Sequence, residues 1–201
     1  MGGQANSTVE AQKSPVGLPE TAPIPSMLTL LDRAQQQYPI LRDKGILFTD
    51  TPNTQTGNML EAWPPDETGD PSYPRPKEFP MGQYGIQNFS PETTPNDVAG
   101  DVVSHFLVNS DPALKPLYEQ FTKTFDTPEG QDRLRQDYSY ARQNEGERRP
   151  MKDWAQADRI PAYLRGRVFK QFPEKAQTGA YTPDQIQILD QIQALIQGGK
   201  R

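Results

Sequence analysis

The 201-residue sequence contains no cysteine, a single histidine and no long apolar run. Without cysteine the chain forms neither disulfides nor thiolate metal sites. No segment approaches the roughly 20 apolar residues that a membrane-spanning helix needs, and the first 20 residues lack the apolar core of a secretory signal. We therefore expect a chain made in the cytoplasm, with no membrane span, no metal and no other cofactor.

Apolar residues are also scarce. They make up 33% of the chain, against roughly 45–50% in typical globular domains when glycine is counted with them. Fourteen of the 21 prolines lie in the first 95 residues, whereas helix-start signals gather in the remainder. This asymmetry predicts an extended, irregular N-terminal half and a helical C-terminal half.

Residues 1–39 are predicted to form an extended arm with one short docking helix. Prolines at positions 15, 19, 23 and 25 favour extended backbone, and isolated apolar side chains lie between them. From Ser26 to Pro39 an apolar stripe at helical spacing indicates about three turns of helix. We expect the apolar side chains of this arm to contact a partner; they are Val16, Leu18, Ile24, Met27, Leu30 and Leu31.

Residues 40–94 are predicted to be a proline-rich cover with short strands. The strand candidates are Ile46–Thr49, Met59–Trp63 and Tyr84–Phe89, and the prolines between them exclude long central strands. We expect a small antiparallel sheet. The run Tyr73–Pro76 is interpreted as a rigid loop clamp around Arg75, with a recognition surface as the alternative.

Residues 95–201 are predicted to form about five helices. Thr94, Asp111, Thr127 and Thr182 each precede a proline, which places a capping side chain before the first helical position. A further helix is expected from Pro161 to Phe172. The predicted fold is therefore mainly α, of the α+β class, with a small helical bundle, a loop-rich cover and an extended arm.

One constellation suggests chemistry. Asp101 and the only histidine, His105, are four residues apart on a predicted helix, which is a spacing suited to general-base catalysis or metal binding. The favoured interpretation is structural, because an Asp–His pair at this spacing is ordinary on a helix surface. If the protein were an enzyme, the candidate catalytic residues would be His105, Asp101 and Glu61, the last from an acidic cluster beside Trp63.

A basic segment is the second candidate. Residues 148–175 hold 8 basic and 3 acidic side chains, in a chain whose net charge is −5. Five members could contact phosphate or an acidic partner: Arg148, Arg149, Arg165, Arg167 and Lys170. The favoured interpretation is a solvated helix face that pairs with neighbouring carboxylates, with nucleic acid as a weaker alternative.

Several short strings resemble uncharacterised proteins of tailed bacteriophages. They are Met59–Pro65, Tyr73–Pro76, Gly100–His105, Tyr163–Gly166 and Tyr181–Pro183. The resemblance covers roughly residues 55–197 and implies a setting, the virion, without implying an activity or any site residue.

These observations together favour a non-enzymatic structural or accessory protein of a phage virion. It would be synthesised in the host cytoplasm and would bind neighbouring virion proteins through its N-terminal arm. The alternatives are a small phage hydrolase with an Asp–His site and a module that contacts DNA inside the particle.

Overall fold

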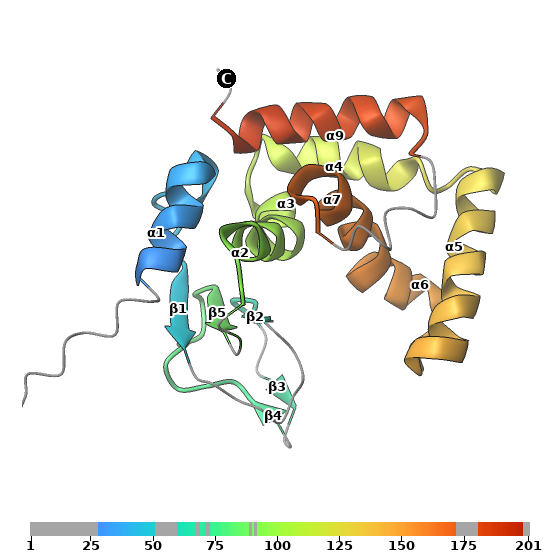
Figure 1. Cartoon of the computed structure of the whole chain (residues 1–201). Helices are drawn as coiled ribbons and strands as arrows, with labels where there is room; N and C mark the ends of the chain where they lie inside the picture. The colour runs from blue at the N-terminus through green and yellow to red at the C-terminus, as the bar shows by residue number, and fades with distance from the viewer. Residues whose placement is uncertain are drawn as a thin grey trace, which may run out of the picture.

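The computed structural model describes residues 28–50, 60–66, 69–70, 73–88, 90, 92–171 and 181–198. Helices form most of this part, and a small sheet lies beside one end of the helical body (Figure 1). The prediction of a mainly helical chain with a short-stranded cover is confirmed. Among the predicted partner-binding residues, Val16, Leu18, Ile24 and Met27 lie outside the described residues.

The first helix, α1 (Leu28–Gln37), packs on its own chain. Leu30, Ala34 and Tyr38 are buried in the common hydrophobic core, and Leu31 is partly buried against it. The Tyr38 and Phe169 rings pack edge to face, with their centroids 5.2 Å apart. The prediction that Leu30 contacts a partner is therefore corrected, because the stripe that includes Leu30 is already covered by the body of the protein.

The sheet is mixed rather than antiparallel. Its strands are β1 (Leu47–Asp50), β2 (Leu60–Trp63) and β5 (Gly85–Asn88), in the order β1-β5-β2. β5 pairs with β2 in the antiparallel sense but with β1 in the parallel sense. All three strands were predicted at these positions, whereas the direction of pairing depends on where the intervening chain returns, which strand patterns do not encode.

One face of this sheet is apolar. Phe48, Ile86 and Ala62 are cross-strand neighbours and pack against the helical core. Because side chains alternate between the two faces of a strand, Thr49, Gln87 and Glu61 share the opposite face. Two further short strands, β3 (Gly69–Asp70) and β4 (Tyr73–Pro74), pair with each other.

Arg75 holds the loop-rich cover together. Its guanidinium donates to five backbone carbonyls, those of Trp63, Pro64, Phe79, Pro80 and Gln83. The bonds to Phe79 and Gln83 are both 2.6 Å long. These bonds tie the end of β2 to the start of β5 and enclose the buried Phe79 ring, so the predicted clamp is confirmed.

The centre of the molecule is a run of three helical segments: α2 (Pro95–Val102), the π turn η2 (Val103–Leu107) and α3 (Val108–Ser110). Residues Val98–Val102 are all buried, between α1, α7 and the sheet (Figure 1). The predicted cap at Thr94 forms as part of a capping box: Thr94 accepts from the Asp97 amide, and the Asp97 side chain accepts from the Thr94 amide at 2.7 Å.

The remaining helices surround this run. They are α4 (Leu114–Lys123), α5 (Pro128–Tyr140), α6 (Met151–Trp154), α7 (Ile160–Phe169) and α9 (Pro183–Ile196). The caps at Thr127 and Thr182 form as predicted. α4 begins three residues after the predicted cap, yet Asp111 still accepts from the Ala113 amide at 2.9 Å.

Two π turns lengthen the helices in the second half: η3 (Ala141–Glu145) follows α5, and η4 (Ala155–Arg159) joins α6 to α7. α7 starts one residue before the predicted Pro161 and ends at Phe169, because Lys170 adopts a left-handed backbone conformation with φ of 58°. Phe172, the predicted end, lies outside the described residues. No helix in the described ranges has both the length and the apolar character needed to cross a bilayer.

Replacing Arg75 by lysine is expected to destabilise the protein by about 1–3 kcal/mol, because an ammonium cannot reproduce the planar fork that reaches several carbonyls at once. Chemical denaturation of the R75K variant measures this loss. Arg135→Lys is the matched control, since Arg135 is exposed and pairs only with Asp132 three residues earlier. Equal stability of the two variants would contradict the role assigned to Arg75.

Candidate functional site

The predicted pair of Asp101 and His105 is brought together at the junction between α2 and the π turn η2. The His105 Nε2 atom lies 4.0 Å from Asp101 Oδ1, which is too long for a hydrogen bond. Asp101 is instead held by other groups: Tyr84 donates its hydroxyl at 3.2 Å, and Arg165 approaches within 3.5 Å. The Asp101 carboxylate therefore links the sheet, α2 and α7.

Burial sets the charge state of His105. Removal of the imidazole from water lowers its pKa below the ordinary 6.5; the Asp101 carboxylate opposes this shift, and the Arg165 guanidinium adds to it. His105 is therefore a neutral imidazole at neutral pH. A neutral ring that donates no orienting hydrogen bond to its carboxylate neighbour does not form the arrangement of an activated catalytic base.

Glu61 does not join this pair. It lies on β2 opposite Gln87, and it forms no hydrogen bond or ion pair with Asp101 or His105. The Oε2 atom of Glu61 and the Oε1 atom of Gln87 are both buried and have no hydrogen-bond partner among the described residues. Within the described ranges, no group of three or more His, Asp or Glu side chains is arranged to hold a metal ion.

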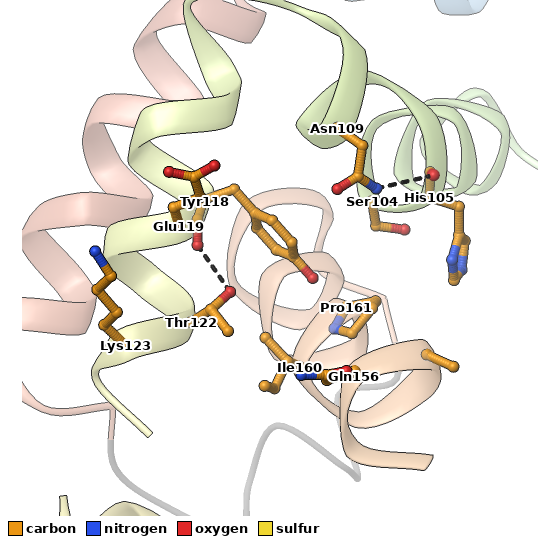
Figure 2. A pocket seen from close by; sticks show the side chains of 11 residues that line it. Ser104, His105, Asn109, Tyr118, Glu119, Thr122, Lys123, Gln156, Ile160 and Pro161 are labelled. Carbon is orange, nitrogen blue, oxygen red and sulfur yellow. Dashed lines mark hydrogen bonds between the residues drawn. The ribbon is translucent and has the colours of Figure 1, made fainter. Parts of the chain in front are cut away.

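His105 does face a pocket. A hollow of about 500 Å³ lies between the η2–α3 segment, α4 and the η4–α7 segment. Figure 2 shows the imidazole and Asn109 on one side, Tyr118 and Thr122 on another, and Gln156 with Pro161 below them. An adjoining hollow of about 250 Å³ shares Thr122, Gln156 and Ile160 with the first.

Two of the three π turns in the described chain line this pocket. Ser104 and His105 belong to η2, and Gln156 and Ala157 belong to η4. A π turn inserts one residue into a helix and widens it, and such turns occur frequently at functional sites. Apolar periodicity does not reveal such turns, so neither this pocket nor the roles of Tyr118 and Gln156 could be predicted from the sequence.

Tyr118 is the main polar group that sequence reasoning missed. Its ring projects from α4 into the hollow (Figure 2), and its hydroxyl forms no hydrogen bond with the described residues. Burial raises the pKa of Tyr118, an effect that the positive charge of Arg165 partly offsets. The hydroxyl is therefore a protonated donor that is available to a ligand.

The five predicted phosphate-binding cations are mostly engaged elsewhere. Arg149 bonds to Glu147 and Asp158, and Arg167 bonds to Asp190 at 2.9 Å. Arg165 faces Asp101, and Lys170 donates to the carbonyl of Arg167. The exposed Arg148 makes only a backbone bond, to Glu147. The structure does not gather these side chains into one cationic surface.

One of these pairings joins Arg149 to Glu147. Hydrogen bonds from the Arg149 side chain and backbone lower the pKa of Glu147 to about 2. A similar pairing lies deeper, where Arg159 bonds to Asp137 at 2.8 Å and Tyr163 donates to the same carboxylate at 2.8 Å. Three of the five candidate cations, Arg149, Arg165 and Arg167, are thus paired with carboxylates of the chain itself.

No protein-family model, curated protein or solved structure matches this chain.

The lowered pKa of His105 predicts a stability change at mildly acidic pH. Below pH 6.5 the unfolded chain takes up a proton on this histidine before the folded chain does, so the free energy of unfolding falls as the pH decreases from 7 towards 5. Urea denaturation at several pH values measures this effect. The free energy of unfolding of the His105→Gln variant is expected to depend less steeply on pH than that of the unmodified protein. No other histidine contributes in this window. The same pH dependence of the free energy of unfolding in both proteins would contradict the lowered pKa of His105.

The role of Asp101 predicts a second effect. Asp101→Asn leaves the largely buried Arg165 without this carboxylate. The substitution is expected to lower the free energy of unfolding, measured by thermal or chemical denaturation, by about 1–3 kcal/mol. Asp190→Asn is the control, because the Asp190–Arg167 pair is more exposed and is expected to contribute less than about 0.5 kcal/mol. An equal loss in both variants would contradict a linking role for Asp101.

Proposed function

We propose that this protein is a non-enzymatic accessory component of a phage particle, which binds neighbouring virion proteins through its N-terminal segment. The observation that carries the proposal is the anchoring of α1. Its Leu30 and Ala34 are buried in the core, and the following Tyr38 bonds to Asn96 at 2.8 Å. Residues 1–27 are therefore joined directly to a helix that is fixed on the body, so a partner bound to them would be held to the whole protein.

The composition of residues 1–27 suits this role. Val16, Leu18 and Ile24 are spaced among prolines, and an extended segment of this kind can place alternate side chains in successive pockets of a partner. Leu30 is buried in the core, whereas Leu31 is only partly buried against it. The candidate contacts are therefore Val16, Leu18, Ile24, Met27 and the exposed part of Leu31. The virion setting rests on the resemblance of the short strings to phage proteins.

The alternatives receive less support. A hydrolase would need an activated base, yet Asp101 is bound to Tyr84 and Arg165 and lies 4.0 Å from the imidazole. A DNA-binding surface would need free cations, yet Arg149 and Arg167 are paired with carboxylates.

Deletion of residues 1–25 is expected to abolish incorporation into particles while leaving the folded body intact, since every core residue described in the structure, from Leu30 onward, is retained. Copies per particle are counted by quantitative mass spectrometry, and thermal unfolding confirms the fold. Replacement of Val16, Leu18 and Ile24 by serine is expected to give the same loss. The matched control replaces the polar Gln4, Gln12 and Thr21 by serine. Normal stoichiometry of the truncated chain would overturn the proposal.

A further inference from the structure

The pocket beside His105 has a chemical character that the proposed function leaves unused. Its walls come from three separate helical segments, and the π turns η2 and η4 supply two of them. Its volume of about 500 Å³ lies within the range of small-molecule sites. The adjoining hollow of about 250 Å³ shares Thr122, Gln156 and Ile160 with it, so an elongated ligand in one hollow can contact residues that also line the other.

Apart from Glu119 and Lys123 at its edge, the polar side chains that line the pocket are uncharged, and several of them lack hydrogen-bond partners among the described residues. The Tyr118 hydroxyl and the Gln156 amide form no hydrogen bond with other described residues, and the His105 ring has no bond partner closer than Asp101 at 4.0 Å. Thr122 and Asn109 donate to carbonyls of their own helices, which leaves their oxygens free to accept. Hydroxyl, amide and neutral imidazole groups can each donate and accept.

The charges around the pocket cancel. Glu119 and Lys123 are one turn apart at the exposed edge of α4, and Asp126 and Lys152 line the adjoining hollow. A phosphate or another anion would find no excess of cations here, and a cation would find no cluster of carboxylates. Ile160 and Pro161 provide an apolar floor beside the Tyr118 ring.

We propose that this pocket binds an uncharged saccharide. A sugar carries hydroxyls that both donate and accept, which match the hydroxyl and amide groups of the walls, and it carries C–H faces that pack on an aromatic ring and on aliphatic side chains. Few other ligand classes combine these two properties without a net charge. The adjoining hollow offers room for a second sugar ring beside the first.

The geometry supports binding without cleavage. Glycoside hydrolysis uses two carboxyl groups that flank one glycosidic bond. Among the described residues that line the larger pocket, Glu119 is the only carboxylate, and it is exposed at the edge. Asp101 is not among the residues that line this pocket, and it accepts a hydrogen bond from Tyr84. This inference is independent of the N-terminal segment, so the two proposals stand or fall separately.

The single histidine provides a direct probe, because the full-length protein without an affinity tag gives only one set of imidazole proton signals in NMR spectra. The titrants are neutral di- and tetrasaccharides of glucose and of N-acetylglucosamine, with inorganic phosphate as the charged comparison. At least one sugar series is expected to shift the His105 signals in a saturable manner, with tighter binding for the tetrasaccharide. Phosphate is expected to leave them unchanged.

Variants place the binding in the pocket. Tyr118→Phe keeps the ring and removes the hydroxyl, and it is expected to weaken binding by up to about tenfold. Gln156→Ala, at an exposed position, tests the opposite wall without affecting the core. Tyr140→Phe is the control, because Tyr140 is exposed and lies outside the pocket. Absence of any saturable shift with these sugars, equal affinity in all variants, or saturation by phosphate would overturn the proposal.

Discussion

The burial of α2 is the constraint on which the rest of the structure depends. Its residues from Val98 to Val102 have no exposed side, since α1, α7 and the sheet each pack on a different face. This packing requires small side chains at defined places. A Cβ atom added to Gly100 would lie 2.4 Å from the side-chain oxygen of Gln171, whose amide bonds to the Asn96 carbonyl at 2.8 Å. Glycine at position 100 thus leaves room for the Gln171 side chain, which follows α7 and bonds to the start of α2.

Local signals explain which parts of this fold were predictable. Thr94, Thr127 and Thr182 cap helices as expected because a capping side chain followed by proline acts within one turn of backbone. The strand positions were likewise readable. The parallel pairing of β1 with β5 was not, nor was the docking of Leu30 on its own body, because both depend on the return of distant segments.

The candidate site shows the same division between local and distant information. The sequence brought Asp101 and His105 to attention through their spacing on one helix, and they are neighbours in the structure. It did not reveal that Tyr84 and Arg165, from other elements, hold the carboxylate. The pocket depends on two π turns and on Tyr118 from a third segment, and none of these has a signature in apolar periodicity.

The parallel pairing of β1 with β5 also bears on the order of folding. Leu47 and Gly85 are register partners, so 38 positions separate them along the chain. Closing so long a loop costs conformational entropy that helix formation within a single segment does not incur. The hydrogen bonds from Arg75 to backbone carbonyls form only after β2 and β5 have paired, because these bonds join the chain at the end of β2 to the chain before β5. We therefore expect the helical body to form early and the strand-bearing cover to close upon it in a later, slower step.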